Sequence, residues 1–100
     1  MLKHVVLWKF KDGISDSEKD GIKNDIKRKL ENLTTLIDGL NDVKVYTDAI
    51  ANSDAEIMLV AELDNKEALT RYHANPEHQK IKDENIVPYI QARLSFDEIV

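Results

Sequence analysis

The segment KHVVLWKFK, residues 3–11, decides the fold because apolar side chains occupy both of its alternating positions. Successive side chains of an extended strand point to opposite faces, so even-numbered residues share one face and odd-numbered residues the other. Val5 and Leu7 make the odd face apolar. The even face carries His4, Val6, Trp8 and Phe10. A strand that is apolar on both faces is typical of the centre of a sheet, and we predict a central strand here.

A second segment of this kind lies within residues 55–63, where residues 57–61 form an unbroken apolar run of strand length. It predicts another central strand. Two further segments alternate apolar with polar residues, and each is apolar on one face only. Their apolar positions are Val43, Val45 and Thr47 in one, and Ala92, Leu94 and Phe96 in the other. One-sided strands tolerate water on the second face, so we predict that these two are edge strands.

The residues between the strands predict helices. Ser15 and Glu18 have the spacing of a capping box, and the apolar period that follows predicts a long amphipathic helix that runs to Asp38 and stops at Gly39. Its apolar residues recur every three or four positions: Ile22, Ile26, Leu30, Leu33, Ile37 and Leu40. A second helix starts at Asp64, which has an acid three residues later, and carries Ala68, Leu69 and Tyr72 on its inner face.

Pro76 ends this second helix, because proline disfavours helical geometry in the residue before it and has no N–H to donate. The tripeptide Asn75-Pro76-Glu77 has the residues of a new helix start: a cap, a proline in the first position and an acid in the first turn. We therefore predict a short additional helix to about Asp83.

The order of elements is β-α-β-β-α-β in a single domain, residues 1–100, and the fold class is α+β. With right-handed crossovers, this order gives a ferredoxin-like fold: a four-stranded antiparallel sheet in the order 4-1-3-2, with helices on one face. The polarity pattern agrees independently, because the two strands apolar on both faces are the central ones in this order.

Helices on one face leave Val5 and Leu7 of the other face in water, and monomers rarely expose a large apolar patch. A terminal segment folded back over the sheet would also cover them, but few residues follow Phe96. We therefore predict a homodimer in which two sheets pack face to face around a two-fold axis.

Composition excludes several classes of function. The 100 residues carry a net charge of −5, which argues against nucleic acid and anionic membranes as partners. There is no cysteine, and no signal peptide or membrane span is visible, so we expect a cytoplasmic protein. Three scattered glycines give no phosphate-binding loop and no dinucleotide fingerprint, and the three histidines have no metal-ligand spacing. We expect neither a metal nor a cofactor.

Two stretches resemble the stress-responsive dimeric α/β-barrel (Dabb) family: His4 with its strand, and Tyr72-His73-Ala74-Asn75-Pro76-Glu77-His78, which contains the pattern Tyr-x-x-x-Pro-x-His. The resemblance covers nearly the whole chain and implies a ferredoxin-like homodimer whose two sheets close into a barrel. Some members of the family are stress-responsive proteins without assigned chemistry. Others are plant polyketide cyclases that close a ring without a cofactor, and in these the catalytic pair maps onto Tyr72 and His78.

The residues themselves make such a pair feasible. Positions six apart in one helix lie about 120° apart around its axis, and the break at Pro76 removes that constraint, so Tyr72 and His78 can face one hollow between helices and sheet. A helix N-terminus disfavours the imidazolium, which leaves His78 as a neutral base, and Tyr72 can donate to a developing enolate oxygen. Alternatively, His78 holds the broken helix in shape and the Tyr72 ring is part of the core. We expect His73 to be exposed.

The same hollow would take a ligand against His4, Val6, Trp8 and Ile26. His4 could equally be an inner histidine with its hydrogen bonds satisfied. Trp8 occupies volume that a polyketide would need, and aliphatic residues stand where the cyclases have aromatic ones in the first helix. Any ligand would therefore be a small apolar carbonyl compound.

Three hypotheses about function follow. The first is a dimeric barrel domain of unassigned activity that serves in binding or assembly. The second is a cofactor-free lyase or cyclase that acts on a small carbonyl or polyketide-like compound with Tyr72 and His78. The third is a heme-free monooxygenase of the similarly folded antibiotic-biosynthesis group, which lacks the Tyr-x-x-x-Pro-x-His match. An enclosed cavity beside Tyr72 and His78 would favour the lyase or cyclase hypothesis over the binding or assembly domain.

Overall fold

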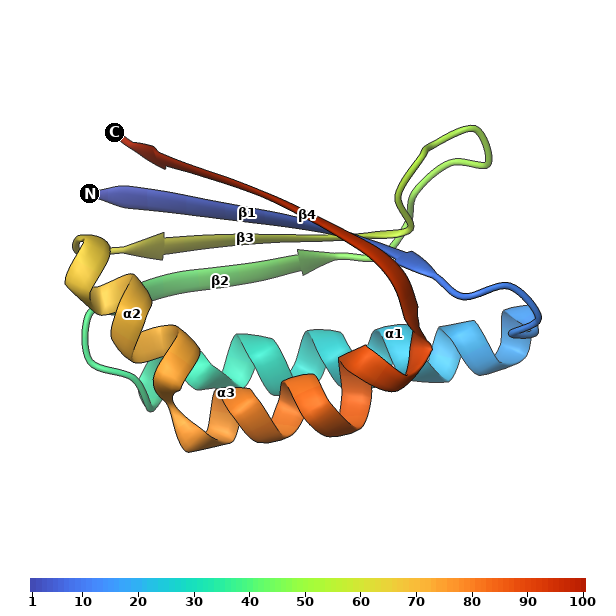
Figure 1. The fold of residues 1–100 in the computed structure, drawn as a ribbon, viewed down its shortest axis with the longest axis horizontal. Helices are drawn as coiled ribbons and strands as arrows, with labels where there is room; N and C mark the ends of the chain where they lie inside the picture. The colour runs from blue at the N-terminus through green and yellow to red at the C-terminus, as the bar shows by residue number, and fades with distance from the viewer.

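The computed structural model describes residues 1–100 and shows an antiparallel four-stranded sheet with helices on one face (Figure 1). The strands are β1 (Leu2–Phe10), β2 (Leu40–Tyr46), β3 (Ile57–Leu63) and β4 (Ile90–Ile99). They lie in the order β2-β3-β1-β4. This order confirms the predicted ferredoxin-like α+β fold, with β1 and β3 in the centre.

The first helix, α1 (Asp16–Glu31), begins at the predicted capping box. Ser15 Oγ accepts a hydrogen bond from the Glu18 N–H at 3.3 Å and donates one to the Glu18 carboxylate at 3.0 Å. The prediction that this helix continues to Asp38 was wrong, because a 3-10 turn, Asn32–Thr35, follows Glu31. Thr34 Oγ1 donates to the Glu31 carbonyl at 2.9 Å, and such hydroxyl bonds to the backbone compete with the α-helical ladder.

Gly39 sits where the chain turns from this 3-10 region into β2. Its φ is +86°, and a Cβ added to it would lie 2.8 Å from Ala68 Cβ and 2.9 Å from Arg71 Nη2. Both residues belong to α2 (Lys66–Ala74), so the glycine permits α2 to pack directly on the turn. Leu40, which the sequence pattern placed in the first helix, is instead the first residue of β2 and is buried.

The break at Pro76 lies where it was predicted. Asn75 ends α2 in an extended conformation and caps α3 (Pro76–Ile81): its Oδ1 accepts the N–H groups of Glu77 at 2.9 Å and His78 at 3.4 Å. A π-helical turn, Lys82–Ile86, and a 3-10 turn, Val87–Tyr89, carry the chain back into β4. No helix here combines the length and the apolar character needed to traverse a bilayer.

The two faces of the sheet differ in burial. On the face toward the helices, the apolar side chains of β1, β2 and β3 form one core with Ile26 and Leu30 of α1 and Tyr72 of α2. On the outer face, Val5 and Leu7 are only half-buried, and their partners in β4, Phe96 and Leu94, are 63% and 69% exposed. The outer face is therefore the apolar patch that the alternation in β1 predicts.

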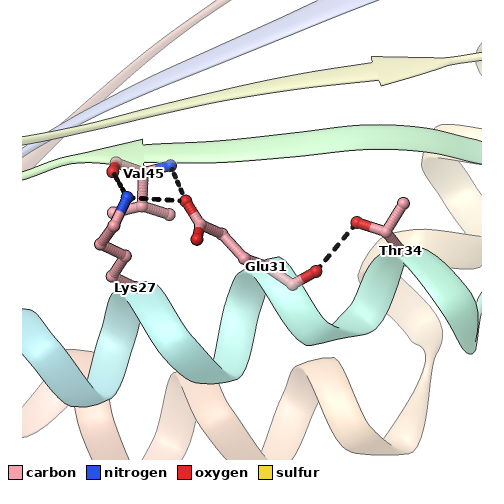
Figure 2. Close-up of polar contacts among 4 residues, drawn as sticks. All are labelled: Lys27, Glu31, Thr34 and Val45. Atoms are coloured by element: carbon pink, nitrogen blue, oxygen red, sulfur yellow. Dashed lines mark hydrogen bonds and ion pairs between the residues drawn. The ribbon is translucent and has the colours of Figure 1, made fainter.

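The edge at β2 is closed by two side chains of α1 (Figure 2). Glu31 accepts the Val45 N–H at 2.9 Å, and Lys27 donates to the Val45 carbonyl at 2.7 Å and to Glu31 at 2.9 Å. Burial alone would raise the pKa of Glu31, but its bonds to Val45 and Lys27 outweigh it and hold that pKa below its usual value. Val45 is thereby engaged on its edge side, which protects β2 from pairing with another strand.

Candidate functional site

A hollow of about 500 Å³ lies between the sheet and the helices, on the side of β4. Its walls are mostly apolar and come from β1, α1, β3 and the segment that leads into β4. The polar groups among its lining residues include Tyr72, His73, His78 and Gln79, which all lie on the two sides of the helix break. The volume is in the range of ordinary small-molecule sites.

The break brings Tyr72 and His78 together, with ring centroids 4.3 Å apart. Tyr72 lies in the last turns of α2 and His78 in the first turns of α3, so each ring leaves a different helix. Gln79 fixes the junction, because its side-chain amide donates to the carbonyl of His73. The helix break at Asn75 and Pro76 therefore allows the side chains of Tyr72 and His78 to point toward the same place, which a continuous helix would not allow.

Two polar atoms of this pair have no hydrogen-bond partner although they are buried. They are Tyr72 Oη and His78 Nδ1. An unsatisfied buried polar group costs about 1–3 kcal/mol, so native proteins rarely retain one without a use for it. Tyr72 is 1% exposed, so its hydroxyl is not at the outer surface of the protein.

Burial sets the protonation states of the pair. It raises the pKa of Tyr72 above its ordinary value, so the hydroxyl keeps its proton and remains a donor. Burial, followed by the neighbouring His73, lowers the pKa of His78 from 6.5 to about 4, so its imidazole is neutral at pH 7. The sequence argument relied on the helix N-terminus for this neutrality, whereas the structure assigns it chiefly to desolvation.

His73 was expected to be exposed, and this was wrong: it is half-buried and lines the hollow. Its ring centroid lies 5.6 Å from that of Tyr72, 5.7 Å from that of His78 and 5.3 Å from that of His4. Burial, followed by the charge of His4, lowers its pKa. Sequence spacing missed this residue because α2 ends within one residue of it, so the position next to Tyr72 also turns inward at the break.

His4 is 2% exposed and has a partner that sequence spacing did not reveal. Its Nδ1 is hydrogen-bonded to Oδ1 of Asp97, a residue 93 positions away that lies directly opposite it in β4. Because an ionised carboxylate only accepts hydrogen bonds, the Nδ1 of His4 carries the proton in this pair. Antiparallel pairing of β1 with β4 is the signal that could have predicted this pair.

The residues expected to bind a ligand divide into two groups. Val6 and Trp8 line the hollow, so Trp8 forms a wall of the space. His4 and Ile26 are fully buried beside it and are not among its lining residues. Lys82 and Arg93, which the sequence did not single out, do line it.

The fold and this hollow define a ferredoxin-like α+β protein with a candidate site under one sheet edge. The chain matches the family Stress responsive A/B Barrel Domain (Dabb) over residues 2–100, and it belongs to this family. This match confirms the resemblance found in the sequence. Among curated proteins, none matches the chain.

Solved structures similar to this chain have diverse descriptions. A dimeric protein of unknown function from Bacteroides fragilis is 25% identical, with a TM-score of 0.92 over 99% of this chain and 95% of that one. A hydroxynitrile lyase from Passiflora edulis is 16% identical, with a TM-score of 0.74 over 99% and 92%. A putative antibiotic biosynthesis monooxygenase from Nitrosomonas europaea is 10% identical, with a TM-score of 0.77 over 100% and 98%. The last two show likeness of fold alone.

Proposed function

We propose that this protein is a cofactor-free lyase or cyclase that acts on a small carbonyl compound, with His78 as general base and Tyr72 as oxyanion donor. One observation carries the proposal: Tyr72 Oη and His78 Nδ1 are buried without partners, and both residues line a hollow of about 500 Å³. A ligand carbonyl and an acidic C–H are groups that would satisfy these two atoms. The hollow supports this hypothesis over an assembly module, although it opens beside β4 and is not enclosed.

The chemistry follows from the two protonation states. Neutral His78 accepts a proton from the carbon next to the carbonyl, and the electron pair of that C–H bond moves onto the carbonyl oxygen. The Tyr72 hydroxyl donates a hydrogen bond to this developing oxyanion. In ring closure, the enolate carbon then bonds to a second carbonyl of the same molecule, and the proton on His78 passes to the new alkoxide. A lyase runs these steps in reverse and breaks the C–C bond.

Proton exchange tests the first step without knowledge of the natural substrate. Small ketones, diketones and oxo acids are incubated with the protein in D₂O, and loss of the α-proton signal is followed by NMR. We expect exchange with at least one class, and a loss of about 100-fold or more in His78→Gln and Tyr72→Phe. Tyr89→Phe is the matched control, because Tyr89 does not line the hollow and its substitution should leave exchange unchanged.

The same variants separate catalysis from structure. Removing the Tyr72 hydroxyl deletes an unsatisfied buried group, so Tyr72→Phe should melt at the same or a higher temperature than the wild type. Ligand-induced NMR shifts without exchange by any compound would contradict the enzyme and support the binding module.

We further propose that two copies pair through the outer face of the sheet. Half-buried Val5 and Leu7 lie beside exposed Leu94 and Phe96 on this face. A second hollow of about 820 Å³ opens here, lined by Leu7, Leu94 and the arm of residues 47–56 between β2 and β3, which rises on the side away from the helices (Figure 1). It contains no histidine, so we interpret it as a docking surface for a second copy.

Sedimentation of two neighbouring variants tests this pairing. Phe96→Glu places a charge on the outer face, whereas Ser95→Glu places the same charge on the opposite face of β4. We expect Phe96→Glu to dissociate the dimer and Ser95→Glu to leave it intact. A wild-type protein that sediments as a monomer would overturn the proposal.

A further inference from the structure

The charges that line the site hollow are all positive. Its charged side chains are Lys82 and Arg93, and none of its lining residues is Asp or Glu. The chain as a whole has the opposite bias, with 19 acidic and 14 basic residues. A cationic hollow in an acidic protein attracts anions and would disfavour cations.

Both cations are available to a ligand. Arg93 lies opposite Trp8 on the face of β4 toward the helices and forms no ion pair. Lys82 begins the π-helical turn, and its nearest carboxylate is that of exposed Asp83, 4.0 Å away, at the limit of an ion pair. Lys82 directly follows α3 and Arg93 lies within β4, so they stand on either side of the turn that connects these two elements in Figure 1. Because Asp83 is exposed to solvent, it would offer Lys82 little competition against a ligand anion.

Lys82 and Arg93 influence the pKa values of Tyr72, His73 and His78. Burial determines the direction of the pKa shifts at Tyr72, His73 and His78, and charges add smaller effects in the same region. Arg93 acts on Tyr72 and His73, and Lys82 acts on His73 and His78, whereas Asp97, which is bonded to His4, acts on His73 in the opposite direction. An anion held by these cations would therefore lie within electrostatic range of the groups to which we assign the chemistry.

We propose that the substrate is a carboxylate-bearing carbonyl compound, an oxo acid with a small apolar body, whose carboxylate binds Arg93 and Lys82 while its carbonyl oxygen lies at Tyr72. The placement of the substrate carbonyl rests on the proposed function. The placement of its carboxylate rests on the charge of the hollow. Guanidinium groups bind carboxylates through two parallel hydrogen bonds, which fixes orientation as well as charge. The aliphatic wall, which includes Val6, Leu30 and Leu59, suits the apolar body.

Binding of such an anion would also strengthen the base. His78 in the empty site is a weak base because its pKa is about 4. A negative charge nearby favours the protonated imidazole and raises the pKa toward neutrality, where general bases are most effective at pH 7. Substrate binding near pH 5.5 should then be accompanied by proton uptake. The uptake is measured by titration calorimetry in buffers of different ionisation enthalpy, and it should decrease in His78→Gln.

The decisive experiment compares matched ligands by NMR titration of the full chain. The probes are 4-methyl-2-oxopentanoate, its methyl ester and a phosphonate analogue of similar size. We expect the acid to bind at least about tenfold more tightly than the ester, with an advantage that shrinks at high salt. Equal binding of acid and ester would overturn the inference. Tighter binding of the phosphonate would also overturn the carboxylate assignment, in favour of a phosphate ligand.

Charge-removing variants locate the anion site. Arg93→Gln and Lys82→Gln should each weaken binding of the acid about tenfold and leave the ester unaffected. Arg71→Gln and Lys80→Gln are matched controls, because both residues are exposed on α2 and α3 and neither lines the hollow. Equal losses in the controls and the test variants would show a general charge effect and contradict the proposed site.

The two proposals fail in different ways. If the acid binds in an Arg93-dependent manner but no α-proton exchanges, the catalytic proposal fails and the anion site stands. If exchange requires Tyr72 and His78 but proceeds equally well on the ester, the catalytic proposal stands and the carboxylate inference fails.

Discussion

The two edges of the sheet are built in opposite ways. At β2, the inner side chains are buried over α1, and Lys27 and Glu31 occupy the backbone groups of Val45 (Figure 2). At β4, all residues from 91 to 99 are exposed, and the hollow opens beside the first of them. Helices therefore cover one half of the sheet and leave the other half open. The candidate site therefore lies where helical cover ends, beside the half of the sheet that is packed against the helices.

The largest expected effect concerns packing in the two halves. Ile26 of α1 is fully buried under the covered half, and we expect Ile26→Ala to lower the free energy of unfolding by about 3–4 kcal/mol. Ile90, at the start of β4, is half-buried and lines the hollow, so Ile90→Ala removes the same atoms at a cost of about 1 kcal/mol. Urea denaturation measures both. Equal losses would show that the open half is packed as tightly as the covered one.

A smaller effect concerns pH and the open half. The unfolded chain protonates His78 near pH 6.5 and the folded chain near pH 4, so the unfolded state binds more protons between these values. The free energy of unfolding should therefore decrease as the pH falls from 6.5 to 4, by about 2 kcal/mol after allowance for partial solvent screening. Below pH 4, His78 is protonated in both the folded and the unfolded state, and the stability it contributes above pH 6.5 is fully lost. His78→Gln should flatten the decrease, and parallel curves for the two proteins would contradict a neutral, buried His78.

The smallest effect concerns the closed edge. Glu31→Ala removes the acceptor of the Val45 N–H and should lower stability by about 1 kcal/mol while it increases aggregation through β2. Asp20→Ala is the control on the same helix, because Asp20 is exposed and forms no ion pair. Thermal melts with light scattering follow both properties. Similar behaviour of the two variants would show that the cap at Val45 does not protect the edge.

The sequence predicted most of the fold but only part of the site. Apolar residues on both faces of residues 3–11 and the unbroken apolar run at 57–61 placed β1 and β3 in the centre, and Asn75-Pro76 located the helix break. The Tyr-x-x-x-Pro-x-His pattern made Tyr72 and His78 candidates through the family resemblance. Asp97, Lys82 and Arg93 were not identified, because their relation to the hollow depends on strand register and on a π-helical turn. The end of α1 was also missed, since bonds such as that of Thr34 to the backbone oppose a helix that the apolar period favours.

The sequence by itself determined the layers of this protein, the order of its strands, the apolar outer face of its sheet and the break that separates Tyr72 from His78. These features depend on periodicity and on local backbone chemistry, which each segment carries within itself. Only the tertiary structure decided that His73 turns inward, that Asp97 pairs with His4, and that both charged side chains lining the hollow are positive. Burial and long-range pairing set these properties, because they depend on residues that meet only when the chain has folded.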